Sequence, residues 1–289
     1  MSMRPLGRLV FVAFALLATK AMSQATTPSS DALFFSCDAR AEAFALAMFN
    51  QGDSSPEAKA AGMEQAKNAI GRATALREAV LSGQDVEEPY GAAANMARLA
   101  KASTLPRTAE LFRRAARDQL TRSHFTAASR RISWAAGLAD DSRAYAYRII
   151  ARDGCGVDQE NIAWIKADLR ANGWFTIDKF GKDAEQAAFL LVQHADKDRE
   201  FQREVLAILE PLAATGQTRP ASYAYLFDRV ALASQKSQRY GTQGRCVETG
   251  RWEPFDVETP DELDRRRATV GLPAEAEYKA RLLKVCGGG

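Results

Sequence analysis

Segments with helical periodicity, separated by short turns, fill most of this chain and restrict it to a mainly α fold. Ser55 and Pro56 supply a cap and a first-turn proline for an Ala-rich segment that stops at Gly83. Thr104 and Pro106 begin another helix in the same way. The same signals predict further helices over residues 126–137, 140–152, 158–172, 182–214 and 219–233.

Short helices joined by short turns predict stacked helical hairpins over residues 31–173. The pattern Thr108-x3-Phe112-x2-Ala115 is similar to the second helix of a tetratricopeptide-type repeat. No period of about 34 residues extends this pattern on either side. We therefore expect N-terminal helical hairpins that are only weakly tetratricopeptide-like.

Residues 174–286 are expected to form a compact helical domain with a small irregular or hairpin insertion. Within the Gly-rich segment 240–257, Glu248-Thr249-Gly250 separates two short runs that favour strands, which is typical of a hairpin. The segment 259–262 has the composition of a capping box with proline at the first helical position, and Pro273 begins the last helix. The expected termini are a flexible lead-in over 24–30 and a disordered tail over 287–289.

The formal net charge of +3 arises entirely in the first 23 residues, which contain Arg4, Arg8 and Lys20 and no acid. The rest of the chain has as many bases as acids, which argues against nucleic acid as a partner because phosphate binding needs a net cationic surface. Residues 9–18 form an apolar run behind basic residues, and small residues precede an expected cleavage after Ser23, with Ser23-Gln24-Ala25 as a second cleavage motif. The run is only about half as long as a membrane anchor requires. We expect a cleaved signal peptide, a periplasmic or secreted protein, and no stable membrane span.

Four cysteines are present, at Cys37, Cys155, Cys246 and Cys286. An even number in an oxidising compartment favours disulfides over a metal site or a nucleophile. Three pairings are possible, and we favour Cys37–Cys155 with Cys246–Cys286 because each bond then closes a separate part of the chain. No C-x-x-C spacing supports a zinc ribbon or thioredoxin chemistry.

Charge is unevenly distributed along the neutral part of the chain. Residues 98–152 contain 12 Lys and Arg but 4 Asp and Glu, whereas residues 248–264 contain seven acids and one Arg. The basic segment is typical either of a site for an anionic partner or of arginines spread over solvated helix faces. The acidic segment predicts intramolecular ion pairs.

Five ordered motifs distinguish the C-terminal part: Val192-Gln193-His194-Ala195-Asp196, Phe201-Gln202, Ala224-Tyr225-Leu226-Phe227-Asp228-Arg229, Gln238-Arg239-Tyr240-Gly241-Thr242-Gln243, and Arg265-Arg266-Arg267-Ala268-Thr269-Val270-Gly271-Leu272. On these motifs, the chain from Trp174 to about Val285 resembles a bacterial domain family of uncharacterised function. The resemblance implies a shared helical fold and a shared set of polar residues. It implies no known activity.

His194 is the leading candidate for chemistry. On a continuous helix it follows Ala187, Leu190 and Leu191 on the apolar face, and Asp198 lies one turn further on. An imidazole on an apolar face with a carboxylate in reach suits an oriented acid–base group, and it equally suits a satisfied buried histidine. Both interpretations stay open at this point. The predicted catalytic residues are His194, Asp196 and Asp228.

Polar residues of the other motifs are candidates for ligand binding. Asp228-Arg229 is typical of an ion pair joining two helices, and the Tyr240–Gln243 segment can either line a site or form a structural turn. The adjacent arginines after residue 264 can bind a carboxylate or phosphate, or pair with the acids before them. The predicted ligand-binding residues are Gln193, Arg229, Tyr240, Thr242, Gln243, Arg265 and Arg266.

Several enzyme classes are excluded by missing motifs. The chain has no G-x-S-x-G elbow, no P-loop and no S-x-x-K, and its two histidines, His124 and His194, cannot form an H-E-x-x-H or three-His zinc site. We predict no metal or cofactor, and we place His124 at the surface of an Arg-rich helix end.

Three functions remain. The first is an exported helical protein that binds a peptide or small polar ligand through its C-terminal domain, with the N-terminal helices as scaffold or as a surface for a protein partner. The second is a hydrolase- or lyase-like enzyme that uses His194 as general acid/base with nearby carboxylates. The third is a structural periplasmic module without a ligand.

Overall fold

The computed structural model describes residues 40–51, 55–152, 154, 156–283 and 286. The expected signal peptide, the lead-in, the C-terminal tail and the Cys37–Cys155 pair lie outside these residues.

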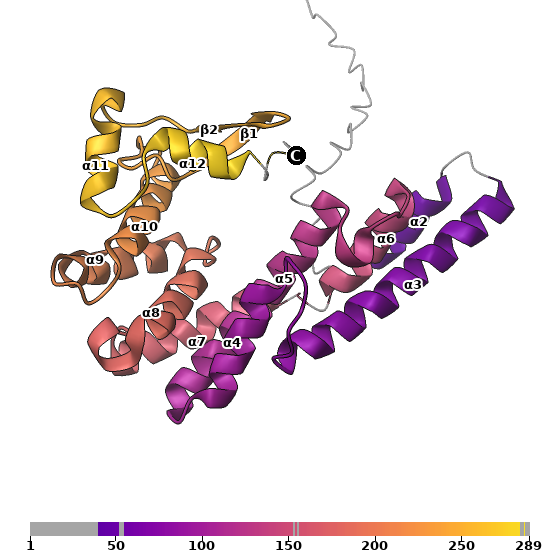
Figure 1. Cartoon of the computed structure of the whole chain (residues 1–289), viewed down its shortest axis with the longest axis horizontal. Helices are drawn as coiled ribbons and strands as arrows, with labels where there is room; N and C mark the ends of the chain where they lie inside the picture. Colours follow the sequence, from indigo (N-terminus) through magenta and orange to yellow (C-terminus); the bar gives the residue numbers. More distant parts are fainter. Residues whose placement is uncertain (1–39, 52–54, 153, 155, 284–285, 287–289) are drawn as a thin grey trace, which may run out of the picture.

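The described chain is mainly α-helical, as predicted, with one small antiparallel sheet (Figure 1). The described residues also include two short 3₁₀ helices, Ser133–Ala135 and Pro260–Glu262. The α-helices are α2 Arg40–Gln51, α3 Pro56–Leu81, α4 Gly91–Ala102, α5 Pro106–Arg130, α6 Asp140–Arg152, α7 Val157–Asn172, α8 Ile177–Gln193, α9 Arg199–Ala214, α10 Pro220–Ala233, α11 Leu263–Thr269 and α12 Glu275–Leu282; the strands are β1 Gly244–Glu248 and β2 Arg251–Pro254.

Helix α3 begins where the sequence predicts. The Ser55 side chain accepts a hydrogen bond from the Ala58 N–H, and the chain leaves the helix at Gly83 with a φ of +73°. The buried face of α3 consists largely of alanines. Small side chains allow neighbouring backbones to approach closely, and a core of α3, α4, α5 and α6 residues forms around Trp134 and Tyr90.

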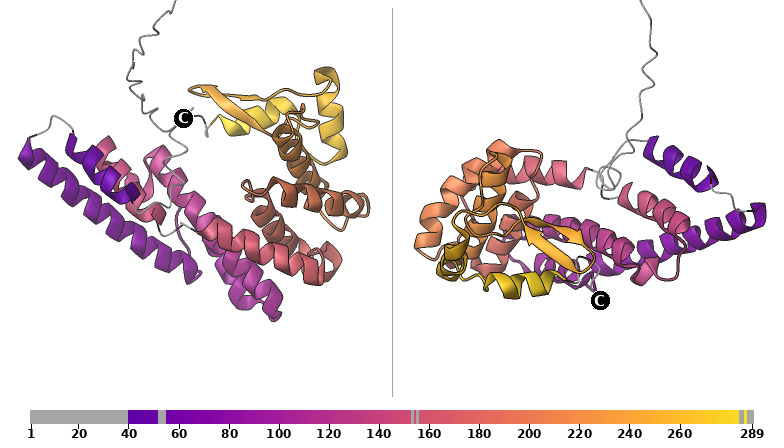
Figure 2. Two further views of the ribbon diagram at one scale, coloured as in Figure 1. Left: turned by 180° about the vertical axis from the view of Figure 1, so that it is seen from behind. Right: turned by 90° about the horizontal axis from the view of Figure 1, so that it is seen from above.

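A second core joins α5 to the C-terminal helices. Leu111 and Phe112 of α5 pack with Ile165 of α7 and Leu191 of α8. In both Figure 1 and Figure 2 the N-terminal helices and the C-terminal elements lie toward opposite ends of an elongated molecule, with α5, α7 and α8 between them. Helix α5 therefore contributes to both cores, and the second core contains residues from both sides of Gly173.

Two predicted helix ranges are wrong. The segment 126–137 is not a helix of its own, because α5 continues to Arg130 and ends at Arg131 in the left-handed region, φ 55°. The segment 182–214 is two helices, since α8 ends at Gln193 and the Asp198 side chain caps α9 by accepting from the Phe201 N–H. His194 therefore lies in a turn between helices.

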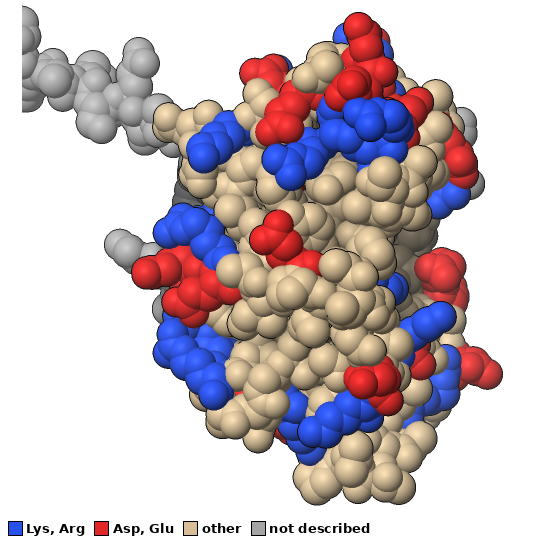
Figure 3. Space-filling model, turned by 90° about the vertical axis from the view of Figure 1, so that its left-hand side faces the viewer, with Lys and Arg blue, Asp and Glu red and all other residues tan. Residues whose placement is uncertain are grey.

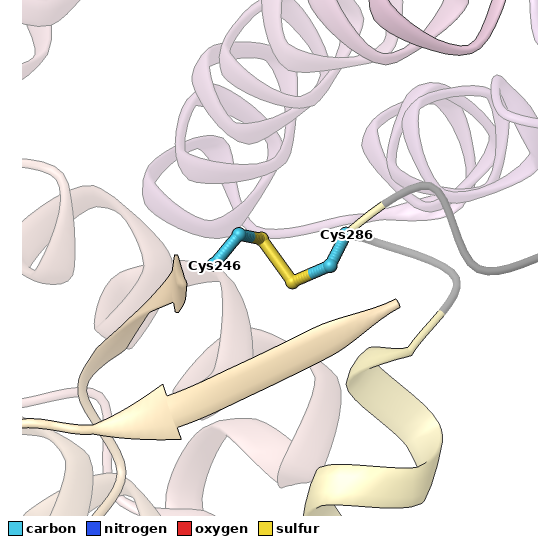
Figure 4. Close-up of a disulfide and its surroundings, with 2 residues drawn as sticks. All are labelled: Cys246 and Cys286. Atoms are coloured by element: carbon cyan, nitrogen blue, oxygen red, sulfur yellow. A yellow bond between two sulfur atoms is a disulfide. The ribbon is translucent and has the colours of Figure 1, made fainter. Parts of the chain in front are cut away.

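The predicted hairpin is confirmed and is fastened to the C-terminus. β1 and β2 pair antiparallel around the turn at Gly250. A disulfide links Cys246 in β1 to Cys286 beyond α12, as predicted (Figure 4). The capping box at Thr259 does not form. Its φ is 38°, its side chain makes no cap hydrogen bond, and a 3₁₀ turn precedes α11.

Most of the charge forms internal pairs. In the acidic segment Glu253 pairs with Lys279, Glu258 with Arg239, and Glu262 with Arg265, which confirms the predicted intramolecular pairing. Figure 3 shows one face of the molecule, on which basic and acidic side chains lie next to each other. Among the described helices, none is long and apolar enough to cross a membrane.

Candidate functional site

His194 forms a dyad with Asp118, which is not among the predicted site residues. Its Nδ1 lies 2.9 and 3.0 Å from the two carboxylate oxygens of Asp118, in the middle of α5. The Asp118 side chain is 1% exposed, whereas that of His194 is 16% exposed. The carboxylate is thus sealed in the protein while the imidazole retains access to solvent.

Other polar groups surround the Asp118 carboxylate. Arg122, one helical turn further along α5, lies 3.2 Å from Asp118 Oδ1 and also bonds to Asp158 of α7 at 3.2 Å. The Gln119 side chain donates to Asp118 Oδ2 at 2.9 Å. On the other ring nitrogen, Nε2, His194 has the Gln193 side-chain amide at 3.5 Å. These polar groups come from α5, α7 and the turn between α8 and α9.

The Asp118 carboxyl group is held in its charged form. Burial raises its pKa, but the His194 charge, the hydrogen bond from His194 and the Arg122 guanidinium together hold the pKa below its usual value. A charged, buried carboxylate on Nδ1 fixes the orientation of the imidazole and directs Nε2 away from the carboxylate. This arrangement suits proton transfer at Nε2.

The lowered pKa of Asp118 predicts a specific pH dependence of stability. Because the folded-state pKa lies below the unfolded value of about 3.9, ionised Asp118 stabilises the fold above that value, and this contribution is lost as pH falls through the folded pKa. Asp118→Asn should therefore be most destabilising above about pH 5, and its deficit should shrink toward about pH 3. Urea unfolding across this range measures the difference. Asp85→Asn, at a fully exposed carboxylate, is the control and should give a small deficit at every pH; a pH-independent deficit for Asp118→Asn would contradict the assignment.

The acids predicted to act with His194 have other partners. Asp196 is half-exposed and bonds to Arg229 at 2.8 Å and Arg199 at 2.9 Å. Asp198 bonds to Lys166. The prediction of one continuous helix that carries His194 and Asp198 is therefore wrong, because α8 ends before His194 and α9 begins after Asp198. Arg229 does form the predicted ion pair between elements, with Asp196 of the α8–α9 turn.

Asp228 organises the loop after α10. It is fully buried, its Oδ1 accepts from the N–H groups of Arg239 and Tyr240, and its Oδ2 accepts from the N–H and the hydroxyl of Thr242. Burial raises the pKa of Asp228, and these four hydrogen bonds act in the opposite direction. Gly241, between two of the donors, has a φ of +59°, a conformation that glycine adopts without strain.

The remaining candidate residues also make internal contacts. Tyr240 is buried edge-on against Phe227, and the Gln243 side chain donates to Thr242 Oγ1 at 3.0 Å. Arg266 donates to the carbonyl oxygens of Arg239, Glu258 and Thr259. Arg265 is largely exposed in a pair with Glu262. This geometry favours the structural-turn interpretation of the loop.

His124 is not at the surface, contrary to the prediction. It is 6% exposed, and its Nδ1 lies 3.0 Å from the Tyr90 hydroxyl. Burial, followed by the charge of Arg77, lowers the pKa of His124 to about 4. The Arg-rich neighbourhood suggested solvent, but the imidazole contacts the Tyr90 and Trp134 rings in the core.

Two central residues were missed. Asp118 continues the apolar face formed by Leu111 and Ala115 at helical spacing, and an acid at such a position is a readable signal for a buried pair. Arg267 is fully buried, donates to the carbonyl oxygens of Pro273 and Tyr240 at 2.6 Å, and stacks on Tyr278. Arg267 belongs to one of the sequence motifs. Which of its three consecutive arginines is buried depends on how α11 is oriented against the rest of the protein, and the sequence does not give that orientation.

No group of three or more His, Cys, Asp and Glu side chains within the described ranges could hold a metal ion. The site is built from one imidazole, one buried carboxylate, a guanidinium and two amides.

The fold and site define a mainly α-helical protein with a polar His–Asp corner and a disulfide-fastened hairpin. Residues 125–288 match the family of unknown function DUF6624, and because this match covers more than half of the chain, the protein belongs to that family. The match begins in the second half of α5, well before Trp174, so the family domain includes the last part of the N-terminal helices. No curated protein and no solved structure matches the chain.

Proposed function

We propose that the protein is an acid–base enzyme, hydrolase- or lyase-like, in which Nε2 of His194 transfers a proton to or from a small polar substrate. The observation that supports this most directly is the pair of contacts between His194 Nδ1 and the buried Asp118 carboxylate, at 2.9 and 3.0 Å. A carboxylate that receives Nδ1–H keeps the lone pair on Nε2, and it stabilises the imidazolium that forms when Nε2 takes a proton.

The surroundings of the dyad suggest the polar substrate class. Arg122 is 26% exposed beside Asp118, and a planar guanidinium binds carboxylate or carbonyl oxygens well. The side-chain amide of Gln193 lies next to Nε2 and offers both a donor and an acceptor. These groups suit a substrate with an anionic or carbonyl group close to the transferred proton.

Ligand binding at the Tyr240–Gln243 loop has less support than acid–base catalysis. The loop's donors are directed at Asp228, and the Gln243 backbone N–H donates to the buried Gln238 side chain at 2.7 Å. A ligand at this place would have to displace hydrogen bonds that hold the loop together. A surface for a protein partner on the N-terminal helices stays a prediction.

We further propose that the protein works in an oxidising compartment outside the cytoplasm. The Cys246–Cys286 disulfide supports this location, since disulfides persist in such compartments. The signal-like first 23 residues support it from the sequence.

The histidines allow a direct test of the acid–base proposal. Because the chain has two, His124→Gln and His194→Gln assign both imidazole signals in NMR spectra of the full chain. We expect a His194 tautomer with the proton on Nδ1 when the ring is neutral. We also expect hydrolysis of p-nitrophenyl acetate, a substrate that requires only an accessible imidazole, to fall by about tenfold or more in His194→Gln.

His124→Gln is the matched control and should keep the wild-type rate, because that ring is buried and has its own partner. Asp118→Asn should reduce the rate and shift the tautomer toward Nε2–H. Equal rates in wild type and His194→Gln, or an Nδ1 without a proton, would contradict the proposal and favour a purely structural His194–Asp118 pair.

A further inference from the structure

A cavity of about 210 Å³ lies between α3, α5, α6 and the start of α7, on a different face of α5 from the His194–Asp118 dyad. Its walls include Ile70, Leu120 and Ile150, which make it partly apolar. It is smaller than the roughly 300–1,000 Å³ pockets that hold drug-sized molecules. Its size and lining suit a small molecule with a short apolar body.

Three arginines from three separate helices line this cavity: Arg77 of α3, Arg117 of α5 and Arg152 of α6. Among the described residues that line it, none is Asp or Glu. Arg117 bonds to Glu160 at 2.9 Å, and both side chains are about half-exposed. A guanidinium has five N–H donors, so each arginine can keep an intramolecular partner and still donate to a ligand.

His124 is part of the cavity wall and carries no charge at pH 7. Its pKa is lowered to about 4 by burial and then by the nearby Arg77, so the ring is neutral at pH 7. A neutral imidazole adds hydrogen-bonding capacity without adding charge. The positive charge of the lining therefore comes from the guanidinium groups.

We propose that this cavity binds a small organic anion, a carboxylate with a short apolar body. The carboxylate would bond to the guanidinium groups, which recognise planar oxyanions with paired donors, and the body would contact Ile70, Leu120 and Ile150. The proposal assigns a role to Arg117 and Arg152 of the basic segment 98–152, which line the cavity. Other arginines of that segment have internal partners, such as Arg107 of α5, which pairs with Asp168 of α7. It does not depend on catalysis by His194.

The proposal can be tested with two carboxylates, benzoate and hexanoate, and with inorganic phosphate as an anion that has no apolar body. Isothermal titration calorimetry of the full chain measures binding, and thermal unfolding measures the change in melting temperature. Both carboxylates should bind and raise the melting temperature, and phosphate should bind at least tenfold more weakly because it leaves the apolar wall uncovered. Arg117→Gln should weaken carboxylate binding by about tenfold, the loss of one charge-assisted contact.

Arg113→Gln is the matched control. Arg113 is on the same helix in an exposed pair with Glu110 and does not line the cavity, so binding should be unchanged. Thr74→Phe, at the exposed edge of the cavity, should block binding without changing the charge, and His194→Gln should bind as the wild type does. No binding of either carboxylate at about 10 mM, or an equal loss in Arg113→Gln and Arg117→Gln, would overturn the proposal.

Discussion

Asp228→Asn is expected to lower the free energy of unfolding by about 3 kcal/mol, although the side chain hardly changes shape. The fully buried carboxylate accepts four hydrogen bonds, from the N–H groups of Arg239, Tyr240 and Thr242 and from the Thr242 hydroxyl. Asparagine has one acceptor oxygen, and its NH₂ group would face N–H donors. Two buried donors would lose their partner, and each such loss costs about 1–3 kcal/mol.

Urea unfolding of the two proteins measures this effect, and NMR amide signals of residues 239–242 locate it. Asp264→Asn is the matched control, since Asp264 is exposed and accepts a single bond from the Glu275 N–H, which an asparagine oxygen can also accept. We expect a loss below about 0.5 kcal/mol there. Equal, small losses in both variants would show that the loop does not depend on the Asp228 carboxylate.

Removing the Cys246–Cys286 disulfide should have a comparable effect, a loss of about 4 kcal/mol. The bond joins residues 40 positions apart, and its main contribution is to restrict the unfolded chain. The variant carries both Cys246→Ser and Cys286→Ser, so that neither cysteine of this disulfide remains as a free thiol. Thermal and urea unfolding give the loss, and hydrogen exchange should increase first in β1, β2 and α12, where Lys279 also pairs with Glu253.

The single variants Cys246→Ser and Cys286→Ser serve as the controls. Each alone removes the whole bond, so each should match the double variant within about 0.5 kcal/mol. A double variant within about 1 kcal/mol of wild type would show that the hairpin and α12 are held by their other contacts.

Helix α5 connects the two proposals. Asp118 and Arg122 face α7 and the α8–α9 turn, whereas Arg117, Leu120 and His124 face the cavity. The helical period places these two sets on different sides of one helix. The family match begins at Phe125, so the aspartate of the dyad comes from a part of α5 that precedes the matched range.

Local chemistry explains what could be predicted. The start of α3 follows from Ser55 and Pro56, the hairpin turn from Gly250, and the disulfide from two cysteines in the same C-terminal part. In the first two cases the residues that form the feature are close in sequence. In the third, Cys246 and Cys286 are the two cysteines of the C-terminal part. Local pattern also gave wrong predictions, among them the capping box at Thr259, which does not form because Thr259 is in a left-handed conformation after the β-hairpin.

The site could not be predicted in the same way. The apolar face of α8 continues in register through Phe201 and Val205, so the pattern alone gives one long helix through His194. The structure ends α8 at Gln193, and His194 then reaches Asp118, 76 positions earlier in the chain. Which carboxylate meets an imidazole depends on how helices pack, and periodicity does not contain that information.

The sequence by itself determined the helical class, the position of most helix starts, the hairpin, one disulfide and the motifs of the family, because each of these follows from residues that interact over a few positions or from composition. The tertiary structure decided the partner of His194, the burial of Asp228 and Arg267, and the cavity beside His124. Each of these brings together groups from separate helices, and only the packing of α5 against its neighbours sets their distances.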